Sequence, residues 1–181
     1  SSLYNMIDSI YIGQGVGPLA ISGLAVTFPL MNLSTAFGTL VGAGAATILS
    51  VFLGRKKYSA CNKVLSNVVS LNIINGLIFM AVALACIDPI LYFFGASENT
   101  IGYATDYMSI YAVGTVFVQL TLGMGSFITA QGFAKTGMMT VLIGAVSNII
   151  LDPIFIFGFQ MGVKGAALAT ILAQCITLLW Q

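Results

Sequence analysis

The sequence predicts an all-α membrane protein, a polytopic bundle of six transmembrane helices whose first and last helices are truncated. The 181 residues are 59% hydrophobic and only 6% charged, with a mean hydropathy of +1.03. Soluble domains carry about 25% charged residues, so this chain has too few to cover a water-soluble surface. Long apolar runs separated by short polar turns are typical of membrane helices. A membrane β-barrel would instead show alternating segments of about 10 residues.

The helices can be placed from these apolar runs. The first run, residues 1–12, is shorter than the about 20 residues that cross a bilayer, so we interpret it as the second half of a helix. A glycine-rich turn at 13–18 separates it from the next run. The last run ends without a polar flank, so its helix is also expected to be incomplete. The five later runs cover 19–52, 64–87, 103–131, 138–158 and 165–181.

Two features of the second run bear on packing. The run is long enough to be tilted in the bilayer or bent at Pro29. Its second half spaces small residues four apart, at Gly38, Gly42 and Ala46. We interpret this spacing as a face for close contact with another helix.

The basic residues predict the orientation. Five of the six follow the second and fourth runs, whereas only Lys164 lies on the opposite side. Because cytoplasmic loops of membrane proteins carry an excess of Lys and Arg, we expect a multi-pass protein of the cell (inner) membrane, in contact with the lipid bilayer. Its missing N-terminus is expected to be cytoplasmic. The five residues are Arg55, Lys56, Lys57, Lys63 and Lys135.

The residue types exclude several classes of function. The chain has no His, and its three Cys form no Cys-x-x-Cys pair, so they signal neither a disulfide framework nor a metal site. It also lacks paired catalytic carboxylates at a suitable turn, which argues against an enzyme. There is no basic patch for nucleic acid, and no cofactor is indicated.

One acidic residue lies deep in an apolar run. Asp152 is flanked by Asn148, four residues earlier on the same helical face, and by Pro153, which removes a backbone donor. An ionisable side chain near the centre of a membrane helix costs about 2.5–3.5 kcal/mol and therefore indicates a functional site. The alternative is a kinked helix whose Asp faces the headgroups.

Polar residues on four different runs fall at one depth. At about 1.5 Å per residue, Asp152 and Thr170 each lie roughly 9 Å below the outer end of their helices. Asp8 and Tyr107 lie about five residues from the ends of theirs. The sequence therefore predicts a polar layer in the outer half of the bilayer.

The charge of this layer indicates what it binds. Asp8 and Asp152 bring up to two negative charges, and no Lys, Arg or His lies within a span to pair with them. Buried carboxylates without a basic partner must take up protons or bind a cation. Oxygen ligands from Asp, Asn and Thr suit a hard ion such as Na⁺. The alternative is that these acids reach water or are paired by another part of the protein.

Three stretches carry a family resemblance. They are Tyr4-Asn5-Met6-Ile7-Asp8-Ser9-Ile10-Tyr11-Ile12-Gly13, Gly23-Leu24-Ala25-Val26-Thr27-Phe28-Pro29 and Asn148-Ile149-Ile150-Leu151-Asp152-Pro153-Ile154-Phe155-Ile156. In this order, and with these span lengths, they resemble the multidrug and toxic compound extrusion (MATE) transporters over almost the whole chain. Members of that family have twelve helices in two six-helix lobes.

The resemblance implies that residues 1–181 form the N-terminal lobe, with the C-terminal lobe of the same chain as its missing partner. It implies an antiporter, coupled to H⁺ or Na⁺, that exports cationic amphipathic small molecules such as drugs or toxic compounds. It also implies that the coupling ion binds to an acidic cluster in this lobe. The residues that match that cluster are Asp8, Tyr107, Asn148, Asp152 and Thr170, of which Asp8, Asn148, Asp152 and Thr170 could bind Na⁺.

Three other functions are alternatives to this one. A lipid-linked oligosaccharide flippase of the same superfamily would need basic residues for pyrophosphate, and the spans contain none. A non-transporting membrane scaffold would bind no coupling ion. A membrane enzyme lacks support from the residue types. The resemblance also implies a polar contribution late in the fourth run, but Leu122 to Gly125 offers no side-chain ligand there. The choice between H⁺ and Na⁺ therefore stays open.

Overall fold

A computed structural model describes residues 2–181 of the chain, and the described part is a bundle of helices without strands. Five helical segments are long and apolar enough to cross a membrane, with α6 and η1 forming one of them. This architecture confirms the predicted all-α, multi-pass membrane fold. The helices are α1 (Ser2–Gly15), α2 (Pro18–Gly54), α3 (Tyr58–Ala85), α4 (Ile87–Phe93), α5 (Ile101–Ala130), α6 (Ala134–Pro153), the π-helical η1 (Ile154–Gly158) and α7 (Val163–Trp180).

The turn after α1 is shorter than predicted. The expected turn at 13–18 is wrong at its start, since α1 continues through Gly15. The chain reverses only at Val16 and Gly17, where Gly17 has a φ of 124° that favours glycine. Pro18 then starts α2, a position where its missing N–H costs no helical hydrogen bond.

The short helix α4 was not predicted. The predicted span 64–87 ends just before Asp88 and Pro89, and no helix was expected between it and the next span. The chain instead forms a seven-residue helix that carries Pro89 in its first turn, where proline is tolerated because that N–H has no intrahelical partner. Tyr92 and Phe93 on this helix are exposed.

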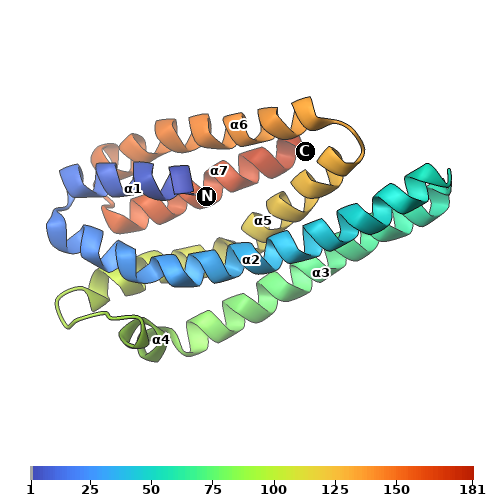
Figure 1. Ribbon diagram of the computed structural model, residues 1–181. Coiled ribbons are helices and arrows are strands. Elements are labelled where there is room, and N and C mark those ends of the chain that lie inside the picture. The colour runs from blue at the N-terminus through green and yellow to red at the C-terminus, as the bar shows by residue number, and fades with distance from the viewer. Residues whose placement is uncertain (1) are drawn as a thin grey trace.

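The helix α5 lies at the centre of the bundle. It packs against α2 and α3 on one side and against α6 and α7 on the other, as Figure 1 shows, with α1 lying beside α6 and α7. Tyr107, Met108 and Ala112 of α5 are fully buried in the main hydrophobic core. Side chains on α5 can therefore contact residues from most of the chain.

Small residues let α2 approach α5 closely. A Cβ atom added at Gly42 would lie 3.2 Å from the Cα of Gly123, and one added at Gly38 would lie 3.3 Å from the Cα of Gln119. The predicted role of these glycines in helix contact is thus confirmed. Their lack of side chains brings the two backbones together, so that dispersion contacts form along the interface.

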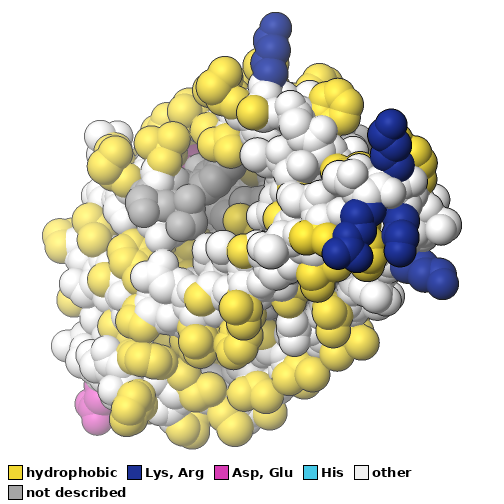
Figure 2. Space-filling view, turned by 45° about the vertical axis from the view of Figure 1, so that its right-hand side comes forward, with side chains coloured by type: hydrophobic (Ala, Val, Ile, Leu, Met, Phe, Trp, Pro, Cys, Tyr) yellow, Lys and Arg dark blue, Asp and Glu magenta, His cyan; other side chains and the backbone are white. Residues whose placement is uncertain are grey.

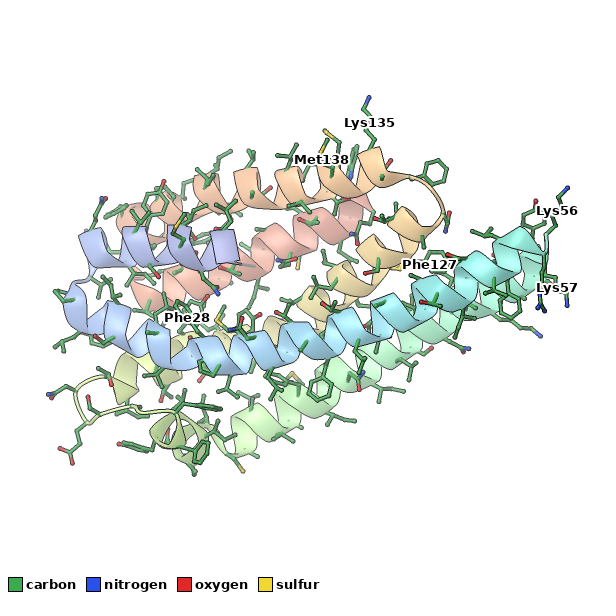
Figure 3. All side chains as sticks on the ribbon, viewed as in Figure 1. Phe28, Lys56, Lys57, Phe127, Lys135 and Met138 are labelled. Atoms are coloured by element: carbon green, nitrogen blue, oxygen red, sulfur yellow. The ribbon has the colours of Figure 1, made fainter. Side chains whose placement is uncertain are left out.

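The two ends of the bundle differ in charge. The α2–α3 and α5–α6 turns lie at the same end, where Lys56, Lys57 and Lys135 point outward (Figure 3). The space-filling view shows basic side chains gathered at this end (Figure 2). Near the other end, Lys164 lies 3.6 Å from Asp106, and both side chains are about half exposed. We refer to the end that carries the α2–α3 and α5–α6 turns as the basic end.

Candidate cation site

Four helices bring polar side chains together in the buried interior, in the half of the bundle away from the basic end. Asp8, Tyr107, Asn148 and Asp152 are 0% exposed, and Thr170 is 4% exposed. Asp8 comes from α1, Tyr107 from α5, Asn148 and Asp152 from α6, and Thr170 from α7. The structure therefore brings together the four residues that were predicted to share one layer, and Asn148, which was predicted to lie beside Asp152 on the same helical face.

Asp8 accepts hydrogen bonds from two neighbouring helices. The Tyr107 hydroxyl donates to Asp8 Oδ2 over 3.0 Å, and the Thr170 hydroxyl reaches the same oxygen over 3.0 Å. Thr170 Oγ1 also lies 3.0 Å from the carbonyl oxygen of Ala166. A hydroxyl has a single proton to donate, so these two bonds of Thr170 are alternatives.

Asn148 connects Thr170 with the second carboxyl group. Its Nδ2 atom lies 3.4 Å from Thr170 Oγ1 and 3.4 Å from Asp152 Oδ1. The four side chains thus form a chain of contacts in the order Asp8, Thr170, Asn148, Asp152. The last two distances are long for hydrogen bonds, so the hydrogen bonds at the Asp152 end are weaker than those at the Asp8 end.

Three oxygen atoms of this chain have no hydrogen-bond partner among the described residues. They are Asp8 Oδ1, Asn148 Oδ1 and Asp152 Oδ2, and all three are buried. A buried oxygen without a partner loses hydration without compensation. Carboxylate and amide oxygens in this state are the ligands that a hard cation prefers.

No positive side chain offsets the two acids. All six Lys and Arg residues of the chain are exposed, and the chain contains no His. Within the described residues, no group of three or more His, Cys, Asp or Glu side chains could hold a metal ion. The site therefore suits a monovalent cation or a proton rather than a transition metal.

The helix that carries Asn148 and Asp152 changes geometry directly after them. Pro153 lies inside the helix, and the next five residues form the π-helical turn η1. Proline leaves the carbonyl four residues earlier without its helical donor, and π-helical turns occur frequently at functional sites. The predicted weakening of the helix beside Asp152 is therefore visible in the structure.

Tyr111 belongs to the surroundings of the site, although it was not predicted to take part in ion binding. Its ring is 3% exposed and stacks on Tyr107, with ring centroids 6.1 Å apart and an interplanar angle of 14°. The signal in the sequence was the spacing of four residues between Tyr107 and Tyr111, which places both rings on the same face of one helix. The stacking fixes the ring that donates to Asp8.

The remaining acids lie outside the site. Asp88 is exposed and accepts a 3.3 Å hydrogen bond from Thr105. The amide of Asn5, three residues before Asp8 on the same helix, is only half-buried. Asp106 pairs with Lys164 near the surface, and Glu98 is exposed. The Asp-Pro-Ile sequence thus occurs once at the surface, at Asp88, and once in the interior, at Asp152.

A second group of buried polar side chains was not predicted. Gln119 of α5 lies with its Nε2 atom 3.5 Å from Ser34 Oγ of α2, and Asn72 of α3 lies against α5 at Gly123. All three polar side chains are 0% exposed. Gln119 is twelve residues from Tyr107, or about 18 Å along the helix axis, so this group is separate from the cation site. An amide within an apolar run was the signal in the sequence.

Comparison with known proteins decides the family. The profile of the MatE family matches residues 1–154. The chain belongs to the MatE family. It is 35% identical over 176 residues to the multidrug export protein MepA of Staphylococcus haemolyticus (strain JCSC1435), a match that covers 97% of this chain and 39% of that protein. MepA of Staphylococcus aureus (strain MRSA252) is 34% identical over 174 residues, covering 96% and 39%.

Solved MATE structures share the fold. A crystal structure of MATE in the bent conformation superposes with a TM-score of 0.94 at 27% identity, over 99% of this chain and 40% of that one. The MATE multidrug transporter DinF-BH, solved in complex with a ligand, gives a TM-score of 0.91 at 35% identity, over 97% and 40%. The chain thus spans about two-fifths of these relatives, and its MatE family is a transporter family rather than an enzyme family.

Proposed function

We propose that this chain is the cation-binding lobe of an ion-coupled antiporter that exports cationic amphipathic compounds. The observation that carries the proposal is the buried chain from Asp8 through Thr170 and Asn148 to Asp152, which has three unpartnered oxygens among the described residues and no basic partner. Two such carboxyl groups are stable in the interior only when a proton or a cation neutralises them. An exchangeable ion at this place is what an ion-coupled transporter needs.

The coupling ion is H⁺ or Na⁺. Both interact with the oxygen atoms that are present, and Na⁺ would be bound by Asp8, Asn148, Asp152 and Thr170. Tyr107 donates to Asp8, so it stabilises the carboxylate while the ion is absent. An ion at the unpartnered Oδ1 of Asp8 would share this carboxylate with the hydrogen bond that joins α5 to α1 and would reduce the charge that strengthens it.

The alternative hydrogen bonds of Thr170 give a route from ion binding to helix movement. Its hydroxyl donates either to Asp8 or to the Ala166 carbonyl at the same distance. Neutralising Asp8 would favour the bond to Ala166 and weaken the link between α1 and α7. The π-helical turn after Pro153 would allow the end of α6 to adjust. The result would be a shift between two arrangements of the lobe.

The proposed substrates follow from the relatives and from charge. The related proteins are described as multidrug export proteins, and one related multidrug transporter was solved with a bound ligand. No Lys, Arg or His lies in the described interior of this chain, so nothing there would repel a cation. We therefore propose small cationic amphipathic compounds as substrates of the intact protein.

The remaining parts of the proposal concern the whole protein. Residues 1–181 would be its N-terminal lobe, and the C-terminal lobe of the same chain would form the other side of the substrate path. The protein would lie in the cell (inner) membrane with the basic end in the cytoplasm. The cation site would then be in the outer half of the bilayer.

The test is efflux of a cationic dye by the intact protein in efflux-deficient cells, under an imposed Na⁺ gradient and then under an imposed H⁺ gradient. Asp152→Asn should abolish efflux while expression and membrane insertion are retained. Asp88→Asn is the matched control, because it makes the same substitution in an identical Asp-Pro-Ile sequence, but at an exposed position. It should transport like the wild type.

The gradient that drives efflux identifies the coupling ion. Efflux that continues in the Asp152→Asn variant would contradict the proposed role of this carboxyl group. Efflux that follows neither gradient would contradict ion coupling altogether.

A further inference from the structure

The helices α2 and α3 leave an apolar groove between them that the cation site does not use. The groove has a volume of about 530 Å³ and runs from the middle of the bundle toward the basic end. Leu40 and Ile48 on its wall are 69% and 51% exposed. Their exposure shows that no helix of the described bundle covers this groove. It lies at membrane depth, where lipid chains are the surrounding solvent.

The groove borders a polar and basic pocket on the exposed face of α3. Lys63 and Asn67 line the groove and also a smaller pocket of about 310 Å³, which Asn62 and Ser66 complete. The stem of Lys63 can follow the apolar wall while its ammonium group reaches the polar pocket. The four side chains supply amide, hydroxyl and ammonium donors within two turns of α3.

Further positive charge lies next to this pocket. The α2–α3 turn carries Arg55, Lys56 and Lys57, all exposed. All five acidic residues of the chain lie elsewhere, on α1, on α4, in the loop after it, on α5 and near the far end of α6. The surface around the pocket therefore presents donors and positive charge without a competing carboxylate.

We propose that this groove binds an anionic phospholipid from the leaflet at the basic end. One acyl chain lies between α2 and α3, and the phosphate group binds at Lys63 and the neighbouring amide side chains. The bound molecule must be apolar along the groove and negatively charged at the end near the membrane surface. An anionic phospholipid has this distribution, and basic clusters beside membrane helices bind such headgroups.

The charge requirement distinguishes this site from ordinary lipid contact. A zwitterionic lipid would fill the groove equally well but would gain less from Lys63. Each Lys or Arg near a membrane surface strengthens binding to anionic lipid about fivefold. Removing Lys63 should therefore lower retention of anionic lipid and leave zwitterionic lipid little changed.

The first experiment measures which lipids the intact protein retains. The purified protein is exposed to equal amounts of phosphatidylglycerol and phosphatidylcholine, and the bound lipids are counted by native mass spectrometry. Lys63→Gln should reduce bound phosphatidylglycerol about fivefold. Lys135→Gln is the matched control, because Lys135 lies at the basic end but at the start of α6, on a separate helix. It should retain phosphatidylglycerol like the wild type.

The second variant tests the groove without touching any charge. Gly44 lines the groove, and a Cβ added there meets nothing within 4 Å, so Gly44→Leu should fold and occupy the space of the acyl chain. It should lose the bound phosphatidylglycerol. Gly102→Leu, at a position with equally open surroundings on α5, should have no effect.

Three results would overturn the proposal. The first is full retention of phosphatidylglycerol by Lys63→Gln or by Gly44→Leu. The second is an equal loss in Lys63→Gln and Lys135→Gln, which would mean that overall charge rather than this pocket attracts the lipid. The third is an equal loss of phosphatidylglycerol and phosphatidylcholine in Lys63→Gln, which would mean that Lys63 does not recognise the negative charge of the headgroup.

Discussion

At the residue scale, the two acids of the site differ in how they are held. Asp8 accepts two hydrogen bonds of 3.0 Å from Tyr107 and Thr170. Asp152 accepts a single hydrogen bond of 3.4 Å, from Asn148, and its carboxyl group also contacts that of Asp8. Under the proposed function, Asp8 would organise α1, α5 and α7, and Asp152 would be freer to bind and release the ion. The role of Tyr107 can be measured separately from that of either acid.

Removing the Tyr107 hydroxyl should destabilise the ion-free protein most. The Tyr107→Phe variant leaves Asp8 with one donor fewer, which costs about 1–3 kcal/mol for a buried group. A bound ion would take the place of the lost donor, so saturating Na⁺ or acidic pH should restore most of the stability. Thermal unfolding of the purified intact protein, with and without the ion, measures both effects.

Tyr111→Phe provides the control for this prediction. Tyr111 stacks on Tyr107, so its substitution tests a neighbouring buried ring without removing a donor to Asp8. Its effect on unfolding should be the same with and without the ion. An equal, ion-independent loss in both variants would mean that the Tyr107 hydroxyl is only a packing feature.

At the element scale, α6 combines the site with a break in regular structure. Asn148 and Asp152 lie on its last turns, and Pro153 and η1 follow without an intervening loop. The break lies beside the carboxyl group rather than in the middle of the span. Movement of the chain after Pro153 therefore changes the surroundings of Asp152 first.

Replacing Pro153 should stabilise α6 and slow transport. The Pro153→Ala variant restores a backbone N–H that can bond to the carbonyl of Ile149, and proline in a helix interior costs about 3 kcal/mol. We expect a higher unfolding temperature together with a lower initial rate of dye efflux. Pro89→Ala is the control, since a first-turn proline interrupts no helical bond. Unchanged efflux by a stabilised Pro153→Ala variant would show that the break has no part in transport.

At the scale of the whole molecule, charge divides the bundle into two ends. Five basic residues lie at or near the α2–α3 and α5–α6 turns, whereas the acids of the cation site lie in the other half. The positive-inside rule makes this division a prediction of orientation. The polar loop containing Glu98 would then face outward, and Lys57 would face the cytoplasm.

Cysteine labelling of whole cells tests this orientation. In a background without the exposed Cys86, Glu98→Cys should react with a membrane-impermeant maleimide added to intact cells. Lys57→Cys should react only after the cells are permeabilised, because the reagent cannot cross the membrane. The reverse pattern would place the basic end outside and would contradict the proposed direction of export.

Much of the fold, and most of the residues that make up the candidate cation site, could be predicted from the sequence, because both depend on strong local signals. Apolar runs longer than about 20 residues specify membrane helices, and acids within such runs are rare enough to stand out. The short helix α4 was missed because Asp88 and Pro89 give the same signal at a helix end and in a first turn. Gln119, Ser34 and Asn72 were missed because uncharged polar side chains are less costly in a membrane and less conspicuous in a sequence.

The amino-acid sequence alone was enough to establish the class of this protein: a helical membrane bundle with a basic end, and with two acids that no basic residue in the spans can neutralise. Which atoms meet became known only from the packing of the helices. That packing brings Thr170 and Asn148 between Asp8 and Asp152 and leaves three oxygens without partners among the described residues. Hydrophobicity along the chain is a local property, whereas contacts between α1, α5, α6 and α7 depend on how the helices pack around one another.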